Sequence, residues 1–288
     1  MTNKKRTWFD YFLILFFIII LIVTLYPFLN VLAISLNDAT DTLKNVNLVI
    51  PRIFTLANYK YVFEEGEIFF PFFISIARTV VGTLISVVCT SMLAYTLSRR
   101  DFVFRKGFTL IFVITMYVSG GLIPEYLLVV RTLKLGNNFL VYILPGLVWV
   151  YNVILVRSYI DGLPMALQEA AKLDGANDFK IWYKVIMPLC KPVIATVALF
   201  YAVGQWNSFM DTYLYAKELP TLQYKLYEIM QQATMQLDTH TANATSNAVT
   251  PMAIRMAVTV VAVIPIIIVY PFVQKYFVGG MTLGSVKD

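Results

Sequence analysis

Long apolar runs separated by shorter polar segments dominate the pattern of this sequence. The runs do not alternate residue by residue, as strands would, but extend for about 20 residues, the length that a helix needs to cross a bilayer. In lipid only helices and closed barrels satisfy every backbone polar group, and unbroken apolar runs favour helices. We expect an all-α membrane protein with six spans, near Tyr11–Leu36, Phe69–Leu97, Phe108–Val130, Phe139–Ile160, Pro192–Tyr215 and Met256–Phe277.

The Lys and Arg residues at the ends of the runs predict the orientation of the chain. They are more numerous in the loops on the same side as the two termini, and cytoplasmic loops carry such an excess. We therefore expect both termini and the polar segment between the fourth and fifth spans to be cytoplasmic. The first run is longer than a signal-peptide core and contains Pro27 and Asn30, so an uncleaved span is preferred to a cleaved signal.

Composition agrees with a membrane protein and excludes several other classes. The chain is 59% hydrophobic and 14% charged, and its net charge of +6 follows the span ends instead of forming a nucleic-acid-binding patch. Cys89, Cys190 and His240 have no metal-ligand or disulfide spacing. We found no P-loop and no hydrolase or protease motif, so we expect no catalytic residue, no metal and no cofactor bound by this chain.

The polar segment 161–190 is organised as two short helices between spans four and five. Pro164 suits a first helical turn, and the first helix is expected over Pro164–Leu173. Gly175 supplies a turn that ends it, and Asn177 or Asp178 can cap a second helix. That helix is expected over Phe179–Met187, with an aromatic and apolar face formed by Phe179, Trp182, Tyr183 and Ile186. Such a pair of helices could lie on the membrane surface or could bind a cytoplasmic partner.

A motif within this segment resembles the cytoplasmic loop of the permease subunits of bacterial ABC importers. That family's pattern is E-A-A, three residues, G, nine residues, I, one residue, L-P. Glu169-Ala170-Ala171 and Gly175 match, and Val185 and Met187-Pro188 follow at the expected spacing with apolar replacements. The resemblance implies a coupling helix that binds an ATPase, with coupling residues Glu169, Ala170, Ala171, Asp174, Gly175, Phe179, Trp182 and Pro188.

Essentially the whole chain is similar to the second permease subunit of carbohydrate importers related to the maltose system, and within them to the YtcP-like subgroup for oligosaccharides or polysaccharide fragments. The resemblance implies a type I ABC importer permease with one domain, 1–288, and a coupling loop at 161–190. It also implies the other components, namely a second permease, two copies of an ATPase that uses ATP and Mg, and an extracellular lipid-anchored binding protein. The location implied is the bacterial cytoplasmic membrane, and the tail Gly279–Asp288 would reach toward the ATPase.

Polar residues inside the spans are the candidates for a sugar pathway, because they are costly in lipid and tend to face a cavity. Amides and carboxylates beside indole rings suit sugar hydroxyls and the apolar faces of pyranose rings. We select Gln205, Trp206, Asn207, Asp211, Asn152 and Trp149, with Glu125 and Arg78 as further candidates. The alternative is that these residues join helices to one another.

Two other functions remain open at this stage. A secondary transporter or channel would work without an ATPase, and a membrane scaffold would bind a cytoplasmic partner without moving solute. No internal repeat supports the first of these.

Overall fold

The computed structural model describes residues 7–45, 49–64, 67–238 and 249–280, which leaves Lys4–Arg6 and most of the predicted C-terminal tail outside the described residues. Helices make up most of the described chain. An isolated β-bridge joins Asn37 and Phe54. The chain divides into two compact units, Met1–Ile68 with Lys225–Ile264 and Phe69–Tyr224 with Pro265–Asp288.

The first unit begins with the apolar helix α1, Trp8–Ser35. The backbone N–H of Thr7 donates to the Asp10 carboxylate at 2.6 Å, which satisfies a group left free at the helix start. Most large apolar side chains of α1 are exposed, as expected for a surface that lipid covers. The other helices with residues in this unit are α2 (Ala39–Lys44), α3 (Ala57–Glu64), α13 (Leu222–Asp238) and α14 (Pro251–Gly280), of which α13 and α14 continue into the second unit.

Asparagine side chains fold the segment that follows α1 against the end of that helix. The Asn37 Oδ1 atom accepts from the backbone N–H groups of Arg52 and Ile53, both at 2.8 Å. The Asn58 Nδ2 atom donates to the carbonyls of Ser35 and Asn37 at 3.0 Å. The described part of the segment between α1 and α4 is therefore an ordered structure.

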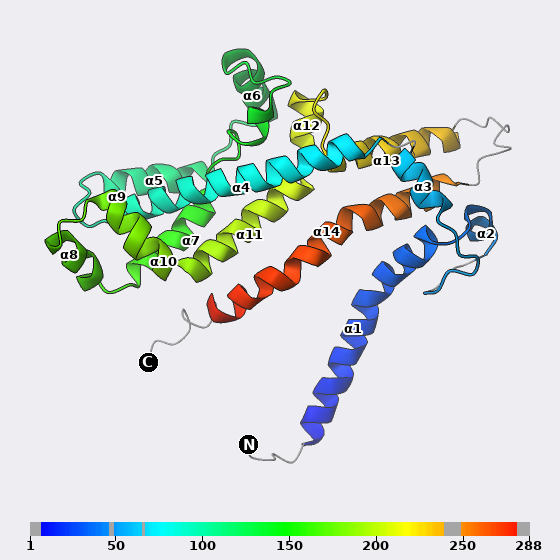
Figure 1. The fold of residues 1–288 in the computed structure, drawn as a ribbon, viewed down its shortest axis with the longest axis horizontal. Coiled ribbons are helices and arrows are strands. Elements are labelled where there is room, and N and C mark those ends of the chain that lie inside the picture. Colours follow the sequence, from blue (N-terminus) through cyan, green and yellow to red (C-terminus); the bar gives the residue numbers. More distant parts are fainter. Residues whose placement is uncertain (1–6, 46–48, 65–66, 239–248, 281–288) are drawn as a thin grey trace. The chain divides into compact units, whose positions relative to one another are not determined.

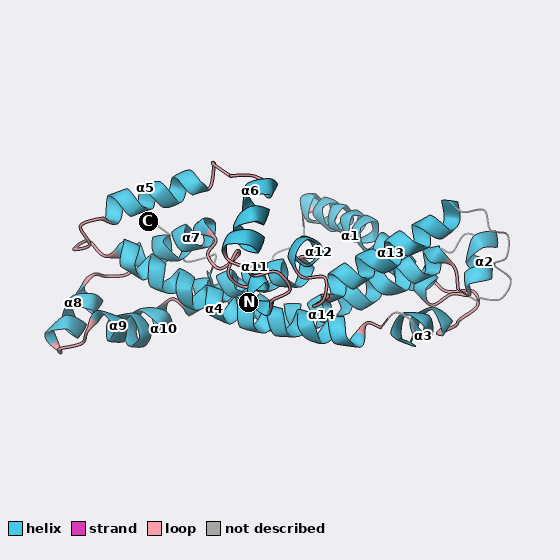
Figure 2. Ribbon diagram, turned by 90° about the horizontal axis from the view of Figure 1, so that it is seen from above, coloured by secondary structure: helices cyan, strands magenta, loops and turns pink. Residues whose placement is uncertain are grey.

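In the second unit, α4 (Phe69–Ser98) packs along α11 (Lys191–Asn207) and α7 (Val150–Asp161), as Figures 1 and 2 show. Apolar side chains from these helices form a buried core that includes Ala94, Val156 and Val197. The core continues into the short helices after α7, which lie at the Ser98 end of α4 in both views. They are α8 (Ala166–Leu173), α9 (Asp178–Ile181), η3 (Trp182–Ile186) and α10 (Met187–Leu189).

The third, fourth and fifth apolar runs are broken where continuous helices were expected. Gly121, at φ +84, interrupts the third run, and Pro145-Gly146 interrupts the fourth. In the fifth run Ser208 takes an extended conformation, with ψ 132. The resulting pieces are α5 (Arg105–Thr115), α6 (Leu122–Leu127), η1 (Leu128–Thr132), η2 (Phe139–Tyr142) and α12 (Met210–Tyr215).

Three described helices are long and apolar enough to cross a membrane: Trp8–Ser35, Phe69–Ser98 and Pro251–Pro271. A fourth appears if Asp178–Leu189 and Lys191–Asn207, which meet at 88°, are counted as one bent span. The 88° bend turns the chain from the coupling loop into α11.

Candidate functional site

The turn at Gly175 gives the predicted coupling loop, 161–190, a defined shape. The N–H of Gly175 donates to the carbonyl of Lys172 and that of Ala176 to the carbonyl of Ala171, both at 3.0 Å. These two bonds form a Schellman motif, which requires a left-handed residue at Gly175, and its φ is +75. The Asn177 Oδ1 atom then accepts from the N–H of Lys180 at 2.9 Å and caps α9. The predictions for the glycine turn and the asparagine cap are confirmed.

The motif residues of α8 present an open surface. Glu169 is exposed, and its carboxylate forms no hydrogen bond or ion pair with another described residue. Ala170 and Asp174 are also exposed, whereas Ala171 is half-buried and packs against the core. Nothing lies within 4 Å of the position that a Cβ would take at Gly175. A carboxylate, a small residue and an open turn are therefore available to a partner.

The aromatic residues of the second helix do not share one face, contrary to expectation. Phe179 and Tyr183 are 62% and 61% exposed, whereas Trp182 is 6% exposed and Ile186 is 1% exposed. Trp182 and Ile186 belong to the buried core, whereas Phe179 and Tyr183, four residues apart on the neighbouring face, lie outside it. The rings of Phe179 and Trp182 remain in contact, with centroids 5.2 Å apart. The helical run also continues past the exposed Pro188 and ends only at Cys190. Trp182 thus holds the loop against the core, and Phe179 stays exposed.

A cluster of charges joins the end of α4 to the coupling loop. The Arg99 guanidinium donates to Asp101 at 2.5 and 2.9 Å and to the Tyr95 hydroxyl at 2.9 Å, and lies 2.8 Å from Asp178. Lys172 of α8 donates to Asp101 at 3.0 Å. Hydrogen bonds from Arg99 and then Lys172 hold the pKa of Asp101 well below its usual range. We call Arg99, Asp101, Lys172 and Asp178 the Arg99 cluster.

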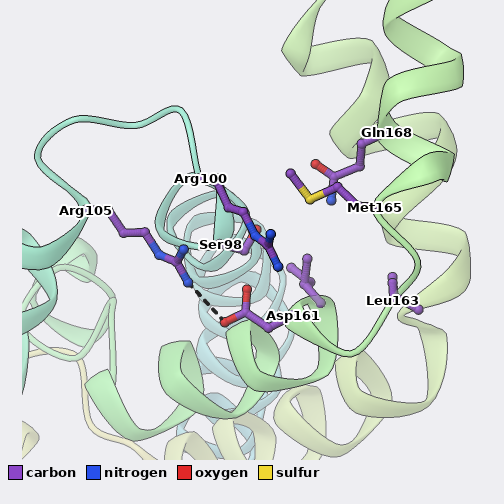
Figure 3. A pocket seen from close by; sticks show the side chains of 8 residues that line it. Ser98, Arg100, Arg105, Asp161, Leu163, Met165 and Gln168 are labelled. Atoms are coloured by element: carbon purple, nitrogen blue, oxygen red, sulfur yellow. Dashed lines mark hydrogen bonds and ion pairs between the residues drawn. The ribbon is translucent and has the colours of Figure 1, made fainter.

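A polar pocket of about 320 Å³ lies beside this cluster, between the end of α4, the end of α7 and the start of α8. Figure 3 shows Arg100, Arg105 and Asp161 on one side of the pocket and Met165 and Gln168 on the other. The Arg105 guanidinium lies 3.5 Å from the Asp161 carboxylate. The first turn of α8 is thus separated from the spans by a hollow.

Arg78, Gln205 and Asp211 form a network inside the second unit. Arg78 is 2% exposed and donates to Gln205 Oε1 at 2.8 and 3.0 Å and to Asp211 at 2.5 and 3.1 Å. Its guanidinium carbon lies 4.4 Å from the Tyr142 ring centroid, and Gln205 Nε2 donates to the Tyr142 carbonyl at 3.0 Å. Three of the predicted pathway residues and candidates therefore bind one another, and the network joins α4, η2, α11 and α12.

The other pathway candidates differ in exposure. Trp149 is 41% exposed and its indole lies over α11, where a Cβ at Gly204 would be 2.5 Å from it. Asn207 is exposed and lies three residues after Gly204, on the same face of the helix. Trp206 is 8% exposed and packs edge-on against Phe72. Indole and amide groups on one face of α11 suit a pyranose ring and its hydroxyls.

Asn152 is fully buried, and its amide has no hydrogen-bond partner among the described residues. A buried amide of this kind is costly without a partner, so Asn152 needs a polar group from outside this part of the chain.

Several residues of the site were not selected from the sequence. Gly204 permits the close approach of Trp149, and Gly82 leaves room for the Gln205 amide, which a Cβ would approach to 2.8 Å. Tyr201 binds the backbone N–H of Trp149 at 2.8 Å. Glycines within apolar helices were the available signal, because they often mark close packing. Among the described residues, no three His, Cys, Asp or Glu side chains gather as metal ligands would.

Apolar helices and an ordered loop with an exposed E-A-A helix indicate a permease subunit of the ABC transporter class, a class of subunit that is not catalytic. A model of the family described as "Binding-protein-dependent transport system inner membrane component" matches residues 2–283. The chain belongs to this family.

Curated relatives and a solved structure cover nearly the whole chain. The polygalacturonan/rhamnogalacturonan transport system permease protein YtcP of Bacillus subtilis (strain 168) is 36% identical over 285 residues, covering 98% of this chain and 99% of YtcP. Protein LplC of the same organism is 38% identical over 268 residues, covering 92% and 90%. A crystal structure of a bacterial ABC transporter involved in the import of the acidic polysaccharide alginate matches with a TM-score of 0.81 and 27% identity, over 96% of this chain and 100% of the matched one.

Proposed function

We propose that this chain is one of two different permease subunits of an importer that carries an oligosaccharide into a bacterial cell. A second permease completes the pathway, two copies of a cytoplasmic ATPase bind and hydrolyse MgATP, and a lipid-anchored binding protein delivers the sugar outside. The observation that carries the proposal is the E-A-A loop with its Schellman turn at Gly175, in a chain that the family model matches over residues 2–283. Both termini and the coupling loop are cytoplasmic in this proposal, and 1–288 acts as one permease domain with six spans.

The coupling loop binds the ATPase through its exposed residues. Glu169 has no partner within the described chain, so a basic group of the ATPase can pair with it. Ala170 permits close approach, and Asp174, Gly175, Phe179 and Pro188 extend the exposed surface. Ala171 and Trp182 face the core and position the loop.

Sugar passes along the face of α11 that carries Asn207 and against which the Trp149 indole lies. The exposed indole stacks on a pyranose ring, and the amide binds hydroxyl groups. Gln205 and Asp211 hold the neighbouring helices through Arg78, and Trp206 packs behind them. The buried side-chain amide of Asn152 has no hydrogen-bond partner among the described residues, so it is available to a polar group that these residues do not supply.

Oligosaccharides that contain uronic acids are the first substrates to test. YtcP is named for polygalacturonan and rhamnogalacturonan, and the matched structure belongs to a transporter involved in the import of the acidic polysaccharide alginate, which supports the choice.

The test is ATP hydrolysis by the purified complex in lipid, with the binding protein and an oligogalacturonide or a neutral oligosaccharide of equal length. We expect stimulation only when the binding protein carries its sugar, and more by the acidic sugar. Hydrolysis that does not respond to any loaded binding protein would refute the importer assignment, and a response to neutral sugars alone would refute only the substrate class.

A further inference from the structure

The coupling helix α8 has few apolar connections to the spans. It packs mainly against α9 and η3, and the pocket of about 320 Å³ separates its first turn from the ends of α4 and α7. Apolar packing against α4 comes from the later part of the loop, where Ile181 and Trp182 enter the core. If movement of α8 is to be transmitted directly to α4, contacts other than this apolar packing must therefore carry it.

The Arg99 cluster provides that connection. Lys172, in the last turn of α8, binds Asp101 at 3.0 Å, and Asp101 binds Arg99 at 2.5 and 2.9 Å. Arg99 also binds Asp178, the first residue of α9, at 2.8 Å. One arginine directly after α4 is thus linked to both helices of the coupling loop.

The chemistry of this position favours arginine. The Arg99 side chain is 9% exposed and is shared by three oxygen-bearing side chains, Asp101, Asp178 and Tyr95. A guanidinium has five donors in a planar fork, so it can bind several such groups at once, whereas a lysine ammonium is a single point charge. The hydrogen bonds to Asp101 raise the pKa of Arg99, so the charge is permanent.

The helix that starts from this cluster ends at the Arg78 network. α4 has no proline beyond its first turn, so it lacks the commonest cause of a kink. Arg78 lies 21 residues before Arg99, which corresponds to roughly 31 Å of α-helix. Displacement of the Arg99 end therefore reaches the Arg78–Gln205–Asp211 network through one rigid element.

We infer that Arg99 is a positioning residue that transmits movement of the coupling helix α8 to α4, through Lys172 and Asp101 on one side and Asp178 on the other. The inference rests on the proposed function, because it assumes that an ATPase moves α8. It assigns a role in coupling to residues outside the E-A-A motif.

The experiment measures both ATP hydrolysis and sugar uptake by the complete importer in proteoliposomes, for Arg99→Gln, Arg99→Lys and Lys172→Gln. Lys106→Gln is the matched control, because Lys106 is exposed, lies close to the cluster in sequence, and loses the same charge without breaking an ion pair of the described residues. We expect Arg99→Gln to raise the ATP hydrolysed per sugar transported by roughly 2- to 30-fold relative to the control. Arg99→Lys should lie between wild type and Arg99→Gln.

Lys172→Gln separates coupling from folding. Its side chain is 45% exposed and its described ion pair is the one with Asp101, so the substitution should leave assembly intact while raising the same ratio. An unchanged ratio in both Arg99→Gln and Lys172→Gln would overturn the inference. A second result would also overturn it. If Arg99→Gln loses hydrolysis, uptake and assembled complex in proportion, and Lys172→Gln leaves the ATP hydrolysed per sugar unchanged, the role of Arg99 is structural. A wild-type complex that does not respond to sugar would instead refute the proposed function.

Discussion

The ion pair between Arg78 and Asp211 offers a quantitative test of whether this network joins helices or contacts sugar. Asp211→Asn removes the negative charge while almost conserving the shape of the side chain. Arg78 is 2% exposed, so its guanidinium remains buried, with Gln205 as its remaining side-chain hydrogen-bond acceptor. Breaking a buried pair from one side costs about 3–5 kcal/mol. Because the Asp211 side chain is 21% exposed, we expect the lower end, about 3 kcal/mol.

The assay is the apparent thermal midpoint of the purified complex, followed as the loss of monodisperse protein after heating. A loss of about 3 kcal/mol corresponds to a decrease of roughly 6–12 °C. Glu64→Gln is the control, because Glu64 pairs with Lys60 at 3.8 Å with both side chains exposed, and such pairs contribute about 0–1 kcal/mol. Arg78→Met and the double variant complete a double-mutant cycle, for which we expect an interaction energy of about 0.5–3 kcal/mol.

Two results would refute this reasoning. The first is a midpoint for Asp211→Asn equal to that of Glu64→Gln. The second is an unchanged midpoint together with weaker apparent sugar affinity, which would place Asp211 in the pathway as a sugar ligand.

Four further predictions concern three glycines and the effect of pH. Gly204→Ala should displace the half-exposed Trp149 indole, which a Cβ would approach to 2.5 Å, and should raise the KM of uptake while the complex still assembles; an unchanged KM would remove Trp149 from the pathway. Gly82→Ala presses on a buried glutamine amide at 2.8 Å and should instead lower the thermal midpoint, so a stable variant with altered KM would contradict the assignment. Gly175→Val forces a β-branched residue to φ +75, and we expect loss of sugar-stimulated ATP hydrolysis; full stimulation in an assembled complex would contradict the docking role. The pKa of Asp101 is lowered, so the stabilisation from its ion pairs is fully present above the ordinary carboxyl pKa and is lost only as pH falls through the lowered value. The ATP hydrolysed per sugar transported should therefore stay constant from about pH 6 to 8.

Local chemistry made the coupling loop predictable from the sequence. A glycine after a short helix favours a left-handed turn, and an asparagine before the next helix favours a cap; both are observed at Gly175 and Asn177. The apolar runs likewise predicted α1, α4 and α14, because a helix in lipid needs little beyond length and hydrophobicity.

The aromatic face of the loop could not be predicted by the same reasoning. Helical spacing indicates that Phe179 and Trp182 lie close together, and their ring centroids are 5.2 Å apart. It does not show which of the two rings is covered, because Trp182 is buried by residues of α4, α7 and α11 that are distant in sequence.

The two charge networks could not be predicted from the sequence either, because their members are far apart in the chain. Arg78 binds Asp211 across 133 residues, and Lys172 binds Asp101 across 71. Polarity alone marks each residue as unusual within or beside a span, but it does not show whether the partner is another helix or a solute. The breaks in the third and fourth runs have a different origin, since Gly121 and Pro145-Gly146 are local signals that the hydrophobicity of a run does not take into account.

The most direct test of the coupled importer is uptake of labelled oligogalacturonide into proteoliposomes that contain this chain, its partner permease and the ATPase. ATP is enclosed inside, and the binding protein is added outside. The account predicts uptake only when all components and ATP are present, and loss of uptake when ATP is replaced by a non-hydrolysable analogue. Sugar uptake by this chain alone, or by the complete complex without ATP, would contradict it.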